Sequence, residues 1–213
     1  MTKDDLRRRS VGILLFENVE VLDFAGPFEV FSRARLEPGA PSRRSEDSAP
    51  FDVFTVSASG ERLEATGGLV VEPKESFASA PPIDILLVPG GFGTRALTNH
   101  EPTISWIRER AAAASLVTSV CTGALLLAEA GLLEGRRATT HHGALELLRR
   151  PGIDVVEGVR VVEDGVVSSA GVAAGIDMAF HVVSKLCGEA VARETAEYIE
   201  YPYPEGLPAG AVT

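Results

Sequence analysis

The sequence has few cysteines, and they do not form the patterns that a metal site or a disulfide framework requires. Only two, Cys121 and Cys187, occur among 213 residues. They form no Cys-x-x-Cys pair, and no Cys/His spacing typical of a zinc site is present. We therefore expect no metal site, and free thiols of the kind found in a reducing compartment.

Long apolar runs are also absent. The first apolar run, from Val11 to Phe16, ends at Glu17. A secretory signal peptide needs a longer apolar region followed by a small-residue cleavage site, and a membrane-spanning helix needs about 18 apolar residues in a row. The sequence therefore predicts a cytoplasmic protein that has no membrane partner.

Basic residues are outnumbered by acidic ones. Lys and Arg total 20 and Asp and Glu total 30, which gives a formal net charge of −10. A nucleic-acid-binding surface needs a basic patch, and the arginine clusters at 7–9 and 43–44 have no aromatic residues between them. We therefore expect no nucleic-acid partner. The GxGxxG fingerprint and the P-loop are absent as well, so no nucleotide cofactor is expected.

The chain alternates between strand-like and helix-like segments. Short apolar or β-branched runs predict strands over residues 11–16, 51–58, 69–71, 83–88, 115–118 and 137–140. Helix-forming runs predict helices over residues 25–35, 101–114, 124–130, 144–150, 172–186 and 189–198. Asp164-Gly165, between strand-like runs at 159–163 and 166–169, predicts a small β-hairpin. This alternation is typical of an α/β fold with a mostly parallel central sheet and helices on both faces.

The same pattern predicts one domain over residues 11–200. An apolar content of 45% is sufficient for a core. Residues 1–10 are expected to form an N-terminal tail, and residues 201–213 an extended C-terminal tail. Residues 36–50, rich in Pro, Ser, Arg and Glu, are expected to form a surface loop.

Cys121 occupies the most informative position in the chain. The strand-like run 115–118 precedes it and the helix-forming run 124–130 follows it. A cysteine at a tight strand-to-helix turn meets the free N–H groups of the helix, which lower the pKa of a thiol and make it nucleophilic. A lone cysteine is more often a buried structural residue, but the flanking segments here are those of a nucleophile elbow.

Other chemically active residues follow the ends of neighbouring predicted strands. Asp23 follows the first strand, Gly90 and Gly91 follow a central one, and His141 follows a later one. Ligands of open α/β sheets bind outside the carboxyl ends of the strands. We therefore expect these residues to form one site with Cys121.

Each of these residues has two interpretations. Asp23 is either the N-cap of the helix at 25–35 or a desolvated carboxyl with a raised pKa that passes protons beside the thiol. Gly90 and Gly91 either allow a tight turn or bring N–H groups to an oxyanion. Thr122 either starts a helix or binds the reacting group.

The histidines at 141 and 142 and the second cysteine, Cys187, are weaker candidates for site residues. His141 and His142 are adjacent, so both cannot point at one thiol, and spacing alone hardly supports a Cys–His pair. Cys187 lies on an apolar helical face, where a packing role is expected.

Five motifs together resemble the PfpI/ThiJ superfamily, which has the class I glutamine-amidotransferase-like fold. They are VLDFAGP at 21–27, VPGG at 88–91, VCTGA at 120–124, RATTH at 137–141 and SAGVAAGID at 169–177. The similarity extends from about Val11 to Tyr203. It implies a flavodoxin-like three-layer sandwich that forms a homodimer, contains no metal or cofactor, and acts on a small-molecule substrate.

Within this superfamily the chain resembles the isonitrile hydratase branch. That branch has Asp at the position of Asp23, Thr at the position of Thr122, and an aromatic-proline tail like the one at 199–204. The resemblance implies hydration of an isonitrile to an N-substituted formamide. Cys121 would attack the isonitrile carbon, Asp23 would supply and remove protons, and Thr122 would support the reacting group.

The resemblance also implies a set of oxyanion-stabilising or substrate-binding residues, namely Gly90, Gly91, Gly123 and His141. The chain departs from the family pattern at His142, where relatives usually have Trp. Because that position borders the motif, the departure concerns the pocket wall and the shape of the substrate.

Two other functions remain open at this point. One is a glyoxalase, deglycase or amidase activity, although those branches usually carry Glu as the acid. The other is a sensor in which Cys121 oxidises to a sulfenate or sulfinate next to Asp23, without turnover.

Overall fold

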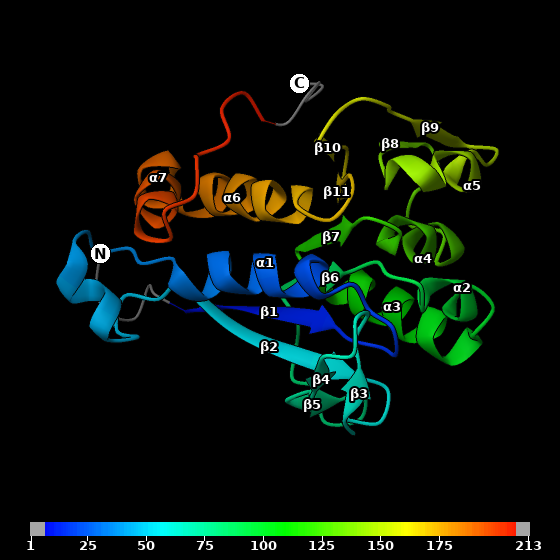
Figure 1. Ribbon diagram of the computed structural model, residues 1–213, viewed down its shortest axis with the longest axis horizontal. Coiled ribbons are helices and arrows are strands. Elements are labelled where there is room, and N and C mark those ends of the chain that lie inside the picture. The colour runs from blue at the N-terminus through cyan, green and yellow to red at the C-terminus, as the bar shows by residue number, and fades with distance from the viewer. Residues whose placement is uncertain (1–6, 208–213) are drawn as a thin grey trace.

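The computed structural model describes residues 7–207 and shows a central seven-stranded sheet (Figure 1). Its strands are β1 (Arg9–Leu14), β2 (Phe51–Ser57), β5 (Glu75–Ser76), β6 (Ile85–Val88), β7 (Leu116–Val120), β10 (Val161–Glu163) and β11 (Val167–Ser169). They lie in the order β10-β11-β7-β6-β1-β2-β5. Every neighbouring pair is parallel except β10 and β11, which form the hairpin at Asp164-Gly165. The predicted sheet and hairpin are confirmed.

Helices cover both faces of this sheet. They are α1 (Val21–Arg33), α2 (Thr94–Leu97), α3 (Glu101–Ala113), α4 (Gly123–Glu129), α5 (Leu145–Leu148), α6 (Ala174–Cys187) and α7 (Glu189–Tyr198). The α1 connection from β1 to β2 runs in one direction along the sheet, and the α3 connection from β6 to β7 runs in the other. Right-handed crossovers in opposite directions place their helices on opposite faces. α6 and α7 pack with α1, whereas α2 and α4 pack with α3.

The strand order reverses between β1 and β6, which pair at the centre of the sheet. In open α/β sheets a crevice forms at such a reversal, outside the carboxyl ends of the strands. Here the loops after the two strands are joined by an isolated bridge between Val19 and Gly91 and by a 2.9 Å hydrogen bond from the Glu20 N–H to the Gly90 carbonyl. The fold therefore creates a site where the sequence predicted one.

The first helix begins earlier than predicted, at Val21. Its N-cap residue is Glu20, and no side chain caps the N–H groups. Asp23 thus lies in the first turn, and its interpretation as an N-cap is wrong. Pro27 lies inside the helix, so the Asp23 carbonyl has no helical N–H partner at that position.

The strands predicted at 69–71 and 137–140 belong to two small sheets, in which their partner strands were not predicted. β3 (Leu63–Glu64) and β4 (Val70–Val71) form an antiparallel pair, while β8 (Arg136–Ala138) and β9 (Ile153–Val155) form a parallel pair outside the main sheet. The strand predicted at 137–140 is therefore not part of the central sheet. Elements of two or three residues are too short to show a periodic pattern.

The predicted loop at 36–50 contains a short 3₁₀ helix, Ala40–Arg44, and packs around Arg35. The Arg35 side chain is buried and donates hydrogen bonds to the carbonyls of Ser32, Ala34 and Ser45. An ion pair with Glu46 completes its surroundings. The segment is thus anchored to the domain by one buried cation.

The predicted tails are described only in part. β1 already begins at Arg9, and residues 1–6 lie outside the described range. Residues 201–207 contain no helix or strand, but Tyr201 donates a hydrogen bond to Asp177 at 2.9 Å and its ring stacks on Phe180. Residues 208–213 lie outside the described range. Within residues 7–207, no helix is long and apolar enough to span a bilayer.

Candidate active site

Cys121 lies in the turn between β7 and α4 with a left-handed backbone, φ 55°. This conformation is strained for a residue with a side chain and is common at functional sites. Neighbouring strands and loops hold it in place. The Cys121 N–H donates to the carbonyls of Ser169 and Ala170, and the Thr140 hydroxyl donates to the Cys121 carbonyl at 2.7 Å. The side chain is buried and its thiol is free.

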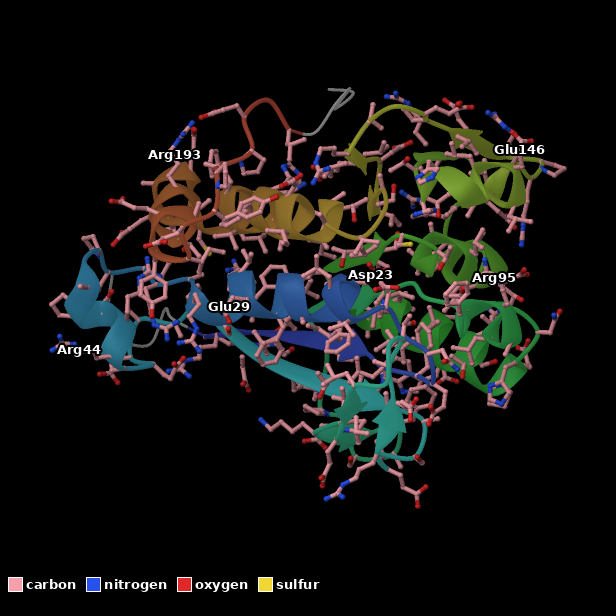
Figure 2. All side chains as sticks on the ribbon, viewed as in Figure 1. Asp23, Glu29, Arg44, Arg95, Glu146 and Arg193 are labelled. Atoms are coloured by element: carbon pink, nitrogen blue, oxygen red, sulfur yellow. The ribbon has the colours of Figure 1, made fainter. Side chains whose placement is uncertain are left out.

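Asp23 is fully buried in the first turn of α1 (Figure 2). Its Oδ2 atom accepts a 2.8 Å hydrogen bond from the Gly90 N–H. Its Oδ1 atom is buried and has no hydrogen-bond partner of good geometry in the described part of the chain. Burial raises the pKa of Asp23 to about 7 and the charge of Glu20 adds to this, whereas the Gly90 N–H and the Cys121 thiol lower it.

The pKa of Cys121 is raised to about 11. Burial is the main cause and the charge of Asp23 adds to it, whereas the N–H groups of Thr122 and Val172 and the Thr122 hydroxyl lower it. The expectation of a lowered thiol pKa is therefore wrong. Donors at the helix start do face the sulfur, but burial beside a carboxyl outweighs them. The resting pair is a thiol next to a carboxyl group that titrates near neutrality.

The N–H groups of Gly90 and Gly91 point at side chains of the site. The Gly90 N–H is bonded to Asp23, and the Gly91 N–H donates to Thr122 Oγ1 at 3.0 Å. Both groups position side chains, so neither is free for an oxyanion in this structure. A Cβ atom on Gly90 would lie 2.5 Å from the Thr122 nitrogen and 2.9 Å from Asp23 Oδ2. Only glycine fits between these two residues.

The N–H group of Val172 was not identified from the sequence. It follows β11 and donates to the Cys121 sulfur, as does the N–H of Thr122. Val172 has φ 40°, an unusual value for a β-branched residue. Two backbone donors from different loops therefore converge on the sulfur. Nothing in the side chain of a valine signals such a role.

A cavity of about 130 Å³ opens in front of the thiol. Its walls come from the loop before α1, from α2 and its preceding loop, from the cysteine turn, and from the loops after β8 and β11. The lining residues are Glu20, Gly91, Phe92, Arg95, Cys121, Thr122, His141 and Val172. Glu20, Phe92 and Arg95 were not predicted as site residues. Arg95 lies over the Phe92 ring, with the guanidinium carbon 5.2 Å from the ring centroid.

His141 lies on the cavity wall, whereas His142 is exposed and does not line it. The Gly143 N–H donates to Nδ1 of His141 at 3.1 Å, so that nitrogen is an acceptor and the ring proton belongs on Nε2. Burial and the neighbouring His142 lower the pKa of His141. The structure therefore presents a neutral imidazole to the cavity.

The remaining predicted residues have packing positions. A Cβ atom on Gly123 would lie 2.0 Å from the Val88 carbonyl oxygen, so this glycine permits close contact between α4 and β6. Cys187 is half-buried at the end of α6 and packs against the core. Within the described residues, no group of three or more His, Cys, Asp or Glu side chains could hold a metal ion.

A buried thiol at a left-handed turn, a buried carboxyl beside it and a small cavity in front define an α/β protein with a cysteine-centred site. The model of the DJ-1/PfpI family matches residues 9–185, and the chain belongs to this family. The resemblance seen in the sequence motifs is thereby confirmed.

Individual relatives extend this similarity along the chain. Isonitrile hydratase from Pseudomonas putida is 37% identical over 203 residues, which cover 93% of this chain and 82% of that protein. The HTH-type transcriptional regulator GbdR from Pseudomonas aeruginosa is 26% identical over 195 residues, or 91% of this chain and 51% of the regulator. The crystal structure of a ThiJ/PfpI family protein from Pseudomonas syringae has a TM-score of 0.82 and 28% identity, covering 96% of this chain and 80% of that one. The fold is accordingly a flavodoxin-like α/β sandwich.

Proposed function

We propose that this protein adds water to an isonitrile and releases an N-substituted formamide, with Cys121 as nucleophile and Asp23 as proton carrier. The observation that carries the proposal is the buried pair itself, a thiol with a pKa of about 11 beside a carboxyl with a pKa of about 7. The 37% identity to isonitrile hydratase over most of the chain supports the same reaction.

The first step joins the sulfur to the isonitrile carbon. Asp23, as a carboxylate, accepts the thiol proton while Sγ bonds to that carbon, and the proton is then delivered to the same carbon. The product of this step is a thioimidate, R–N=CH–S–Cys. The N–H groups of Thr122 and Val172, which face the sulfur, stabilise the negative charge that develops there.

The second step consumes water. Water adds to the thioimidate carbon, one of its protons passes through the carboxyl group to the nitrogen, and a tetrahedral intermediate forms. When its C–S bond breaks, the hydroxyl proton returns to the sulfur and R–NH–CHO is released. The sum is R–N≡C plus H₂O giving R–NH–CHO, so the side chains end as they began.

The test uses the purified full chain with cyclohexyl isocyanide in H₂¹⁸O, and mass spectrometry detects labelled N-cyclohexylformamide. Cys121→Ala is expected to abolish turnover and Asp23→Asn to lower it by about 10²-fold or more, whereas Cys187→Ala, which removes the other thiol, retains it. Absence of turnover with alkyl and aryl isocyanides would refute the proposal. Conversion of methylglyoxal instead would favour the deglycase alternative, and reversible oxidation of Cys121 without any turnover would favour the sensor.

We also propose that the protein forms a homodimer. Leu69 and Val70, at the tip of the β3–β4 pair, are 49% and 61% exposed, a large apolar exposure for two adjacent residues. Sedimentation analysis should give twice the mass of the chain, and Val70→Glu should shift the equilibrium toward the monomer. A monomer at high micromolar concentration would contradict this.

A further inference from the structure

Arg95, in α2, lines the cavity in front of Cys121. Most described arginines form an ion pair with a carboxylate or donate to a backbone carbonyl. Among residues 7–207, however, no carboxylate lies within ion-pair distance of Arg95. The N–H groups of a guanidinium form a planar fork that matches a carboxylate. Arg95 is therefore available to an anionic group of a ligand.

The Phe92 ring gives this guanidinium a defined position. The guanidinium carbon lies 5.2 Å from the ring centroid, an arrangement in which the positive charge is attracted to the face of the ring. The ring is 66% exposed and lines the same cavity. Phe92 therefore provides an apolar wall for a ligand and places the arginine beside that wall.

The cavity runs from a buried thiol to an exposed arginine. Cys121 is buried, whereas Phe92 and Arg95 are exposed, so these two residues lie at the mouth of the cavity. A cavity of about 150 Å³ holds one benzene molecule, and the cavity here has a volume of about 130 Å³. An isonitrile with a single ring therefore fills it, and a substituent on that ring reaches the mouth.

Glu20 carries the opposite charge and lies closer to the reacting groups. Its backbone carbonyl accepts the Asp23 N–H at 3.2 Å, and its own N–H donates to the Gly90 carbonyl. Its carboxylate acts to raise the pKa of both Asp23 and His141, whereas the Arg95 charge shifts neither pKa. The cavity is thus negative near the thiol and positive at the mouth. An isonitrile nitrogen carries a formal positive charge, so this polarity suits a substrate whose negative group lies at the other end.

We propose that Arg95 selects isonitriles that carry a carboxylate on the group attached to the nitrogen. One guanidinium balances one negative charge and Glu20 disfavours a second, so a carboxylate suits the cavity better than a phosphate dianion. The inference rests on the proposed function for the reaction, but binding of the anion beside Cys121 does not require turnover.

Two variants of Arg95 and one control test the selection. Arg95→Met removes the charge and keeps an apolar stem beside Phe92, whereas Arg95→Lys keeps the charge without the planar fork. Arg44→Met is the matched control, because it removes the same charge from an exposed arginine at the opposite end of the molecule (Figure 2).

The first readout is the hydration of para-isocyanobenzoate and para-isocyanobenzamide, which have nearly the same size but differ in charge. The parent should have the lower KM for the benzoate. Arg95→Met should raise that KM roughly tenfold, the effect of one hydrogen bond to a charged group, and should leave kcat unchanged because the lost contact is remote from the reacting atoms. The KM for the benzamide should not change. Arg95→Lys should keep part of the preference, and Arg44→Met should keep all of it.

The second readout needs no isonitrile. In a Cys187→Ala background at pH 9, Cys121 is alkylated by N-(para-carboxyphenyl)iodoacetamide or by its neutral para-carbamoyl analogue. The anionic reagent should react faster with the parent, and Arg95→Met should make the two rates equal.

Equal rates for the two reagents in the parent would overturn the inference, as would a preference that survives in Arg95→Met. An equal loss of preference in Arg44→Met would also overturn it, because overall charge would then be the cause. If the parent hydrates neither isonitrile, the proposed function fails, and the alkylation series still decides whether Arg95 binds an anion beside the thiol.

Discussion

The Gly90 N–H and the Asp23 carboxyl are joined by a 2.8 Å hydrogen bond that links the loop after β6 to the first turn of α1. The bond occupies Oδ2 and leaves Oδ1 as the oxygen without a hydrogen-bond partner of good geometry among the described residues. A carboxyl held at one oxygen has a fixed orientation. The proton exchange of the proposed reaction would therefore use Oδ1, the oxygen that the Gly90 N–H leaves open.

The pH dependence of the proposed reaction follows from the pKa values of Asp23 and Cys121. Only ionised Asp23 can accept the thiol proton, so kcat/KM should rise through pH 7, near the pKa of about 7. It should fall toward pH 11, where the thiol loses the proton that the isonitrile carbon needs. Asp23→Asn should remove the limb near pH 7 and lower the rate at pH 8 by about 10²-fold or more. Initial rates across this pH range are the measurement, and a flat profile for the parent would contradict it.

Asp23 should make the fold less stable as the pH rises, whereas a salt-bridged aspartate makes a fold more stable as the pH rises. The folded protein holds the Asp23 proton up to about pH 7, whereas the reference value for the unfolded chain is 3.8. Unfolding between these values releases a proton, so stability decreases as the pH rises through this window. Asp23→Asn removes the buried charge and should stabilise the protein at pH 8, by at most about 4 kcal/mol. Urea unfolding at pH 5 and pH 8 tests this, since the gain should shrink at pH 5.

Gly90→Ala should lower turnover strongly but reduce the stability of the fold only moderately. The added methyl group would meet the Thr122 backbone and the Asp23 carboxyl at less than 3.0 Å, so both must shift. We expect a loss of about 1–3 kcal/mol in stability together with a turnover below one hundredth of the parent rate, because misplacement by about 1 Å can cost 10²-fold. Gly67→Ala is the comparison: its φ of 88° is unfavourable for alanine, but no atom lies within 4 Å of the new methyl, so activity should persist.

Arg35→Met should destabilise the domain without reaching the chemistry. The lost side chain leaves several buried carbonyls without a donor, which we expect to cost about 3 kcal/mol. Residues 36–50 should become sensitive to limited proteolysis, while Cys121 keeps its alkylation rate. Arg44→Gln, an exposed change in the same segment (Figure 2), should alter neither property.

The sequence allowed the meeting of Asp23, Gly90 and Cys121 to be predicted, because each follows a strand that enters the same edge of a parallel sheet. The path of the chain around the sulfur could not be predicted. Val172 contributes a backbone N–H, and a backbone donor can come from almost any residue type. Its φ of 40° depends on the packing of the loop after β11 rather than on its own preference.

The thiol pKa was mispredicted for a related reason. Helix-forming residues after Cys121 identify the N–H groups that favour a thiolate, and these donors are present. Burial of the side chain, which outweighs them, depends on how the surrounding loops close over it. The start of α1 shows the same limit, since Asp23 resembled a cap only while the helix was assumed to begin after it.

The left-handed backbone at Cys121 and at Val172 has a consequence for how this site can change. Each such residue costs about 1–3 kcal/mol and persists only because the rest of the fold compensates for it. A glycine would adopt either conformation without strain, so selection for stability alone would replace both residues. Replacing Cys121 with glycine should therefore increase the stability of the fold. In a lineage where the thiol is no longer under selection, we expect substitutions that give a more stable, unreactive turn.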